Sequence, residues 1–224
     1  MNNVKKLTFS KICIFDIQNT KKQQFNPLKE FLYYLKFSGV KGVIDFAYSS
    51  HEDSLHKNLT VKQNLILDAI PVSLIKDGEN NLTEFINTLT NPFLIEIIGQ
   101  LGSLNKYVHE LTAGELKMAS IIKAILSQRE YIFLVEPETN LQFNHIQILK
   151  DCIEFEVKNK GKSIFIKPAN KDIWLDISTH IISRCEKTHG YQNIQNPLSK
   201  HGEVEIEKEQ TNKNFNFKLI KKVA

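Results

Sequence analysis

The residue best placed to do chemistry is Glu136, a carboxylate that directly follows the wholly apolar run Tyr131–Val135. Such a run predicts a strand covered on both faces in a parallel sheet. Open α/β sheets place their ligands at the carboxyl ends of such strands. Upstream, the small-residue turn Leu111–Glu115 opens a helical pattern, and N–H groups at a helix N-terminus favour a phosphate. The sequence therefore predicts a strand-end carboxylate and an anion-binding turn in one α/β protein.

The segment between turn and strand is predicted to be a helix with one buried face. Its apolar residues recur at helical spacing: Met118, Ile121, Ile122, Ile125 and Leu126. Downstream, Ile146–Val157 predicts a second helix, and Ser163–Ile166 a second buried strand. This order of elements predicts an α/β fold with a parallel sheet.

This stretch resembles the signature helix and Walker B strand of ATP-binding-cassette (ABC) ATPases. That family has a Leu-Ser-Gly-Gly-Gln/Glu turn, a helix, four apolar residues, Asp-Glu-Pro and a Leu-Asp turn. The positions that match the pattern are Leu111, Gly114, Glu115, Ala124, Glu136, Pro137, Asn140 and Leu141. Thr112 and Ala113 depart mildly, whereas Val135 stands where the family has its magnesium-binding aspartate. The alternative is an unrelated α/β protein in which Glu136 merely ends a strand.

The resemblance also covers the region of the phosphate loop, but the loop's residues are absent. The family's GxxGxGK[ST] loop lets backbone N–H groups approach phosphates, while a lysine neutralises charge and a hydroxyl holds magnesium. Here residues 19–27 contain no glycine, Phe25 stands at the lysine position, and Asn26 and Pro27 take the hydroxyl positions. Lys21 and Lys22 are interpreted as a solvated pair. The helix after the loop is still predicted, with Asn26 as N-cap and Pro27 as its first residue.

Two further positions bear on nucleotide chemistry. The family's γ-phosphate histidine falls on Ala169, and its loop glutamine falls on His51, to which we assign no role. Glu136 alone of the cis catalytic groups is kept, so we interpret it as vestigial. The positions Tyr48, Leu59, Thr60, Val61, Asn64 and Leu65 match the family at the entry to its helical subdomain.

The predicted fold class is α/β: an ABC-type P-loop NTPase-like core, a mixed sheet with flanking helices, plus a small helical subdomain. The core is expected over residues 1–183, with the subdomain at about 61–110. In the family this subdomain touches the membrane subunit; the alternative is that its helices only cap a core. Residues 184–224 are polar and are predicted to be a weakly ordered tail.

Composition sets outer bounds on function. The chain has 224 residues, 42% of them hydrophobic and 24% charged, which is ordinary for a globular protein. No apolar run could span a bilayer, and we expect a cytoplasmic protein, peripheral on the inner face of the membrane. Cys13, Cys152 and Cys185 lack the spacing of a metal site, so no metal is expected. The net charge of +4 comes without a basic and aromatic cluster, so no nucleic-acid partner is expected.

The resemblance implies a degenerate ABC subunit, a pseudo-ATPase with no cofactor bound in cis. Its expected partners are a membrane permease and a second ABC subunit, with a heterodimer favoured over a homodimer. ATP and magnesium would then lie at an interface shared with a competent partner, against the signature turn Leu111–Glu115. Two alternatives remain: a scaffold without any nucleotide site, and a regulatory or nucleic-acid-binding protein on a retired ATPase fold.

Overall fold

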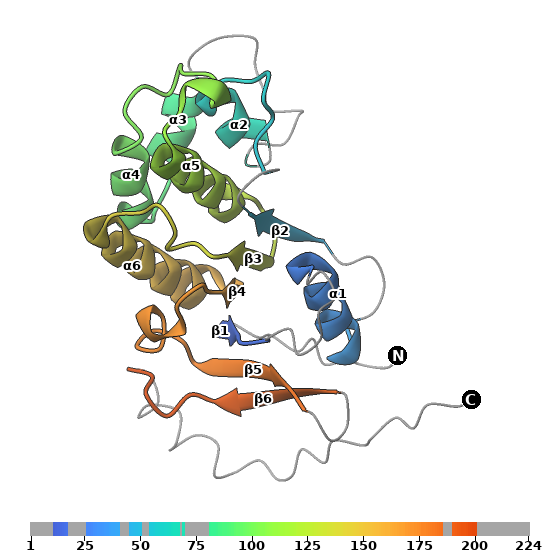
Figure 1. Cartoon of the computed structure of the whole chain (residues 1–224). Helices are drawn as coiled ribbons and strands as arrows, with labels where there is room; N and C mark the ends of the chain where they lie inside the picture. Colours follow the sequence, from blue (N-terminus) through green and yellow to red (C-terminus); the bar gives the residue numbers. More distant parts are fainter. Residues whose placement is uncertain are drawn as a thin grey trace, which may run out of the picture.

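Six strands form one sheet at the centre of the protein (Figure 1). The computed structural model describes residues 11–17, 26–40, 45–50, 54–67, 69, 81–185 and 190–200. Within them the strand order is β2-β3-β4-β1-β5-β6. The strands are β1 (Ile12–Phe15), β2 (Phe46–Ser49), β3 (Tyr131–Val135), β4 (Ser163–Lys167), β5 (His180–Arg184) and β6 (Tyr191–Gln195). Neighbouring strands are parallel except for β6, which runs antiparallel to β5, so the sheet is mixed as predicted.

The two faces of the central strands carry different apolar side chains. In β3, Ile132 and Leu134 join an aliphatic core, whereas Phe133 joins an aromatic core on the other face. Strand β4 repeats the pattern, with Ile164 on the aliphatic face and Phe165 on the aromatic face. Because successive side chains of a strand point to opposite faces, a continuous apolar run supplies both cores.

Helices cover both faces, but unequally. Helices α5 (Ala113–Leu126) and α6 (Phe143–Lys160) pack on the aliphatic face, and α1 (Pro27–Phe37) lies on the aromatic face (Figure 1). The ring of Phe31 in α1 stacks on Phe133 with 4.3 Å between centroids. Asn26 caps α1 by accepting a hydrogen bond from the Lys29 N–H at 2.9 Å. The predicted N-cap and first residue of this helix are confirmed.

The smaller helices lie at the top of the view in Figure 1, where α2 packs beside α5, and α4 beside both α5 and α6. They are α2 (Val61–Leu67), α3 (Asn81–Asn87), α4 (Pro92–Gly99) and the 3₁₀ turn η2 (Val108–Glu110). Residues 88–91 separate α3 from α4. Asn91 caps α4 through the N–H groups of Phe93 and Leu94, and Pro92 takes the first position, where a missing N–H costs nothing.

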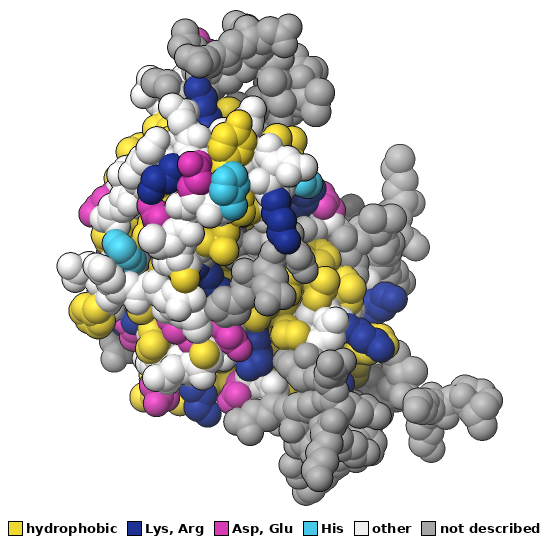
Figure 2. Space-filling model, turned by 45° about the horizontal axis from the view of Figure 1, so that its top comes forward, with side chains coloured by type: hydrophobic (Ala, Val, Ile, Leu, Met, Phe, Trp, Pro, Cys, Tyr) yellow, Lys and Arg dark blue, Asp and Glu magenta, His cyan; other side chains and the backbone are white. Residues whose placement is uncertain are grey.

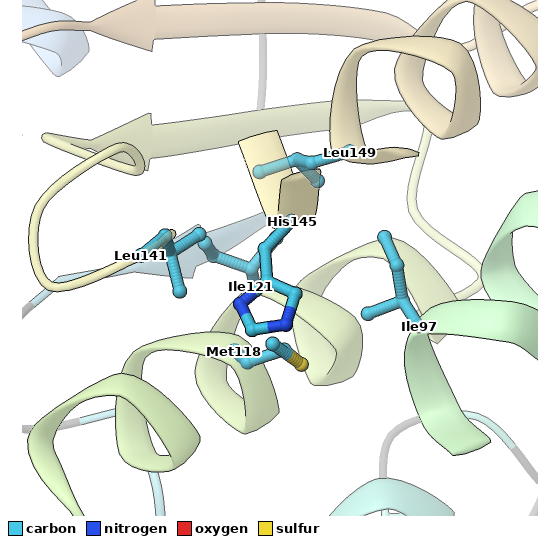
Figure 3. A pocket seen from close by; sticks show the side chains of 6 residues that line it. All are labelled: Ile97, Met118, Ile121, Leu141, His145 and Leu149. Atoms are coloured by element: carbon cyan, nitrogen blue, oxygen red, sulfur yellow. The ribbon is translucent and has the colours of Figure 1, made fainter. Parts of the chain in front are cut away.

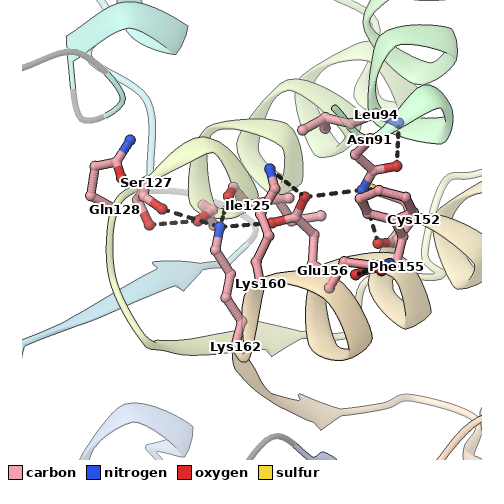
Figure 4. A network of polar contacts seen from close by, with 12 residues as sticks. Asn91, Leu94, Ile125, Ser127, Gln128, Cys152, Phe155, Glu156, Lys160 and Lys162 are labelled. Carbon is pink, nitrogen blue, oxygen red and sulfur yellow. Dashed lines mark hydrogen bonds and ion pairs between the residues drawn. The ribbon is translucent and has the colours of Figure 1, made fainter. Parts of the chain in front are cut away.

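A buried polar network fastens α4 to α5 and α6 (Figure 4). The fully buried carboxylate of Glu156 accepts from the Asn91 side chain at 3.0 Å and pairs with Lys160 and Lys162 at 3.0 and 2.9 Å. Lys162 also donates to the Ser127 carbonyl at the end of α5. One carboxylate therefore joins three helices.

The polar segment after residue 184 differs in part from its prediction as a weakly ordered tail. Residues 190–200 include β6, which pairs with β5 along its whole length, and the Asn196 side chain, which donates to the Leu175 and Ser178 carbonyls. Four of the five β6 residues are exposed, so the strand has no hydrophobic pattern that would reveal it. Residues 201–224 lie outside the described residues. In the part of the chain that is described, none of the helices is long and apolar enough to cross a membrane.

Candidate functional site

The signature turn is held in a fixed shape at the N-terminus of α5. Thr112 and Glu115 form a capping box: the Thr112 N–H donates to the Glu115 carboxylate at 2.8 Å, and the Glu115 N–H donates to Thr112 Oγ1 at 3.3 Å. Lys106 Nζ lies 2.8 Å from the same carboxylate. The hydrogen bonds from Lys106 and Thr112 lower the pKa of Glu115 to about 2. The turn therefore carries an ionised, fully engaged glutamate.

The outer side of this turn is open. Thr112 and Ala113 are exposed. The N–H groups of Ala113 and Gly114, the first two of the helix, have no acceptor among the described residues. The first N–H groups of a helix find no partner within the helix, and they point out along its axis. Two donors at a positive helix end are thus available to an anion from outside the chain.

The inner side of the turn is packed against the loop that follows β3. A Cβ placed on Gly114 would lie 2.8 Å from the carbonyl oxygen of Asn140. Asn140 itself has a φ of 62°, a left-handed conformation that asparagine tolerates better than most residues. The structure thus brings together two of the positions that match the family pattern.

The end of β3 makes a sharp turn at Glu136. This residue has a φ of 47°, and its N–H donates to the Lys167 carbonyl at 2.6 Å, across to β4. Thr139 closes the turn by donating to the Glu136 carbonyl. A positive φ on a glutamate is uncommon and here follows from the tight exit of the strand. Glu136 is half-buried.

Val135 turns its side chain into the aromatic core and is 7% exposed. Its carbonyl oxygen accepts a hydrogen bond from Lys117 Nζ at 2.7 Å. Lys117 lies one turn into α5 and is only 3% exposed. Sequence reasoning missed this lysine, because a lysine beside the apolar positions of a helix is ordinarily interpreted as a solvated side chain.

Glu138 is a second residue that the sequence did not single out. Its carboxylate accepts from the Asn170 N–H at 2.7 Å and from Trp174 Nε1 at 3.1 Å. Both donors flank η3 (Lys171–Ile173), the turn that follows β4. Ala169, which precedes Asn170, is exposed. Glu138 therefore joins the loops after β3 and β4. No local sequence pattern predicts a contact between segments this far apart in the chain.

The region where the family has its phosphate loop is described only in part. Phe25, Lys21 and Lys22 lie outside the described residues, as does His51. Asn26 uses its side chain to cap α1, and Pro27 has no N–H to donate. In the first turns of α1, Glu30 forms two hydrogen bonds with Arg184, at 2.6 and 2.7 Å.

The described residues do not fit a magnesium ion at the end of β3. Hard divalent cations take oxygen ligands. Val135 offers an apolar side chain, and both carboxylate oxygens of Glu138 already accept hydrogen bonds from protein donors. Across the described ranges, no three His, Cys, Asp or Glu side chains come together as a metal site would require.

A crevice opens elsewhere, between α4, α5 and α6 (Figure 3). Its lining is Ile97, Met118, Ile121, Leu141, His145 and Leu149. It leaves a free volume of only about 10 Å³, and His145 is the one polar side chain among these six. Nucleotide-sized ligands occupy roughly 300 Å³ or more, with several polar contacts. On the face turned forward in Figure 2, basic and acidic side chains are interspersed with hydrophobic ones and form no single-sign patch among the described residues.

Comparison with known proteins places this geometry in context. No family model matches the chain. ATP-binding cassette sub-family A member 6 of Mus musculus is 27% identical over 142 residues, 63% of this chain and 8% of that protein. A Pyrococcus furiosus protein described as a putative ABC transporter ATP-binding protein is 28% identical over 88 residues, 39% of this chain and 34% of the relative. The chain thus spans about a third or less of each relative.

The fold comparison agrees with the sequence comparison. The dimeric structure of a bacterial ABC transporter cassette superposes with a TM-score of 0.53 over 78% of this chain and 81% of that one, at 11% identity. The six-stranded sheet with its flanking helices is the cassette fold. The chain therefore has the fold of ABC ATPase cassettes and is similar in sequence to two ABC ATP-binding proteins.

Proposed function

We propose that the chain is a non-hydrolysing ABC subunit of a membrane transport or permease-type complex. Its signature turn would contribute to the ATP site of a partner subunit. The observation that carries the proposal is the open turn of α5. The N–H groups of Ala113 and Gly114 have no acceptor among the described residues, while the capping box of Thr112 and Glu115 keeps the turn in shape. A partner's phosphate is an anion suited to that helix end.

The residues at the cis positions support the non-hydrolysing half of the proposal. Phosphoryl transfer depends on positioned charges around the phosphates. By resemblance, those positions here hold Val135, Ala169 and the phenylalanine at position 25, and they leave only Glu136. Loss of one such stabilising group typically costs on the order of hundred-fold to thousand-fold in rate. We therefore expect the chain to hydrolyse no ATP through its own half-site.

The proposal includes two partners. The curated relatives carry ATP-binding in their names, and the bacterial cassette that shares the fold was solved as a dimer. We place a competent ABC subunit against the signature turn and a permease against α2, α3 and α4, on the inner face of the membrane. ATP and magnesium would lie at the shared interface, held mainly by the competent subunit.

The experiment adds a charge to the turn without disturbing this chain. Gly114 is unsuitable, because any Cβ there meets the Asn140 carbonyl. Ala113 is exposed at the first position of α5, where an aspartate is favourable to the helix. Ala113→Asp would set a carboxylate against a partner's phosphate, and Ala113→Asn is the neutral control of the same size. The complex is reconstituted with the ABC subunit that accompanies the chain in its own cells.

We expect Ala113→Asp to lower ATP hydrolysis by the pair on the order of ten-fold to hundred-fold, with Ala113→Asn much closer to the unmodified chain. Glu136→Gln should leave the rate nearly unchanged, because a general base needs a positioned water and phosphate on its own side. Size-exclusion chromatography confirms assembly. Equal rates of ATP hydrolysis for the Asp and Asn variants would favour the alternative. In that alternative the chain is a scaffold with an ATPase fold and no nucleotide binds at this turn.

A further inference from the structure

The strand β6 lies at one edge of the sheet, and no described strand pairs with its outer side (Figure 1). It pairs with β5 at five consecutive positions without a bulge. Edge strands are usually protected from pairing with other chains by charges, prolines or bulges. The sequence of β6, Tyr191–Gln195, contains neither a charged residue nor a proline, and four of its five residues are exposed. At the opposite edge of the sheet, none of the residues of β2 is exposed.

Every second residue of β6 turns its backbone groups away from β5. Just after the strand, the Asn196 N–H donates to the Thr179 carbonyl at 2.9 Å. In an antiparallel pair, residues that bond across the ladder alternate with residues that face away from it. Counting back from Asn196, the register turns Ile194 and Gln192 toward β5. The residues whose N–H and C=O groups point outward are Tyr191, Asn193 and Gln195.

These three outward residues are arranged symmetrically about Asn193. In an antiparallel contact with a second copy, a twofold axis at Asn193 would set Asn193 of the two copies opposite each other, and Tyr191 opposite Gln195. Each of these pairs could exchange two hydrogen bonds, because both members present an outward N–H and C=O. A twofold dimer requires such a self-complementary surface. Since β6 has no charged residue, this register brings no like charges of the strand together.

Exposed apolar side chains lie beside this edge on both faces of the sheet. On the aromatic face, the ring of Phe37 is 53% exposed and lies 5.3 Å from the ring of Tyr191. Ile194 is 49% exposed and points to the other face, because it is an odd number of residues from Tyr191. In the twofold register, Ile194 of one copy would be the diagonal neighbour of Ile194 of the other. The contact would therefore also remove apolar surface from water.

We infer that β6 pairs with β6 of a second copy of this chain, antiparallel and centred on Asn193, so that the two sheets become continuous. Helix α5 packs against β2 and β3, at the other side of the sheet, so this dimer leaves the signature turn free. The inference goes beyond the proposed function, which concerns a different ABC subunit at that turn, and either one can fail without the other. The contact is smaller than a standard protein interface, so we expect a Kd on the order of 10 μM.

The first test is sedimentation velocity of the full chain from about 1 to 300 μM. The unmodified chain should shift from monomer to dimer, equally with and without ATP and magnesium, because the turn of α5 is not involved. Asn193→Lys and Asn193→Glu should each raise the Kd roughly ten-fold or more, since each sets like charges opposite each other on the axis. Asn193→Gln is the uncharged control and should dimerise almost as the unmodified chain does. An equimolar mixture of the Asn193→Lys and Asn193→Glu chains should dimerise again, which variants that merely disturbed β6 would not do.

The second test is amide hydrogen exchange, resolved by residue with NMR, at monomer and dimer concentrations. In the monomer, the amides of Gln192 and Ile194 should exchange slowly and those of Tyr191, Asn193 and Gln195 quickly; dimerisation should slow the last three. Slow exchange of the Asn193 amide in the monomer would show that another segment of the same chain covers β6, and would overturn the inference. So would a chain that stays monomeric over the whole range, one that dimerises only with ATP, or a mixture of the two charged variants that stays monomeric.

Discussion

The carbonyl oxygen of Asn140 lies where a side chain of Gly114 would begin, 2.8 Å from an ideal Cβ. The contact joins the first turn of α5 to the loop that leaves β3. Real Cβ atoms do not approach a backbone oxygen this closely, so a residue other than glycine at position 114 must push one of the two backbones aside. The glycine of the signature turn is thus required by packing within this chain, independently of any ligand.

The first prediction concerns this contact. Gly114→Ala should destabilise the chain by about 1–3 kcal/mol, the usual cost of overpacking. In a helix, alanine normally stabilises relative to glycine by roughly 0.5–1 kcal/mol. A decrease in the free energy of unfolding of Gly114→Ala would therefore indicate the close contact. Gly99, at the end of α4, has open space among the described residues where a Cβ would lie, and Gly99→Ala is the matched control that should be neutral or stabilising. Urea unfolding of both variants measures the difference; stabilisation by both would refute the contact.

The second prediction is a pH dependence at the signature turn. Hydrogen bonds from Lys106 and Thr112 hold the pKa of Glu115 at about 2. A carboxyl group with a lowered pKa stabilises the folded state above its ordinary pKa, near 4.5, and loses that effect as the pH falls toward 2. Glu115→Gln should therefore cost about 0.5–2 kcal/mol at neutral pH, as loss of a cap does.

The difference between Glu115→Gln and the unmodified chain should shrink as the pH falls from about 4.5 toward 2. Chemical unfolding over that pH range measures it, and Glu110→Gln is the control. Glu110 caps η2 through the Tyr107 N–H, and it has no lysine partner among the described residues. A difference that stays constant with pH would contradict the assignment of the charge.

The third prediction concerns how α1 is held on the sheet. Glu30 in α1 is 8% exposed, and both its oxygens bind Arg184 at the end of β5, while the Tyr191 hydroxyl in β6 donates to it at 2.9 Å. Arg184→Met would leave a buried carboxylate with one donor and should cost about 1–3 kcal/mol. Arg184→Lys should recover only part of this, because an ammonium cannot make the two-pronged contact.

Tyr191→Phe tests the hydroxyl alone. The phenyl ring keeps its packing against Tyr34 and Phe37, with centroids 5.4 and 5.3 Å away, so only the hydroxyl's hydrogen bonds to the carboxylate and the backbone carbonyl of Glu30 are lost. The expected cost is about 0.5–1.5 kcal/mol. Equal stability of the Arg184→Met, Arg184→Lys and unmodified chains in urea would show that the cluster contributes nothing to the anchoring of α1.

Much of the fold could be predicted from local patterns, because strands, buried helix faces and caps depend on residues that are close in sequence. The run Tyr131–Val135 is the observed strand β3, and the five apolar residues predicted to face inward from α5 are all buried. Caps are also local: Asn26 binds a donor three residues away, and Thr60 exchanges hydrogen bonds with Gln63 in the same way. Each of these depends on residues within one turn or one strand.

The contacts that the sequence did not reveal join distant segments. Lys117 meets a carbonyl 18 residues away, Glu138 meets Trp174 across 36 residues, and Glu30 meets Arg184 across 154. Each is a charged residue that would ordinarily be assigned to solvent, and only the packing of the elements shows that it is buried. Strand β6 was missed for a related reason: its pairing with β5 comes from backbone hydrogen bonds, which impose no apolar pattern on exposed side chains.

The fourth prediction concerns the joint between the helical subdomain and the core. Asn91 accepts from the first N–H groups of α4 with its oxygen, and its amide nitrogen donates to the Glu156 carboxylate at 3.0 Å and the Cys152 carbonyl at 3.2 Å (Figure 4). Burial would raise the pKa of Glu156, but Lys162, Asn91 and Lys160 outweigh it and hold the pKa below its ordinary value. The carboxylate is therefore ionised within the protein.

Removing either partner should be strongly destabilising, since it leaves the other buried and unsatisfied. Asn91→Ala should cost about 2–4 kcal/mol, from a lost cap and a lost donor. Glu156→Gln should cost about 3–5 kcal/mol, because Lys160 and Lys162 lose their shared counter-charge. Urea unfolding of the single and double variants gives a cycle, in which the double variant should cost less than the sum by about 0.5–3 kcal/mol. Hydrogen exchange should then show α4 opening in Asn91→Ala while β3 and β4 stay protected. Additive costs, or exchange that rises equally in the sheet, would mean that Asn91 and Glu156 act separately and that α4 is held by its apolar contacts alone.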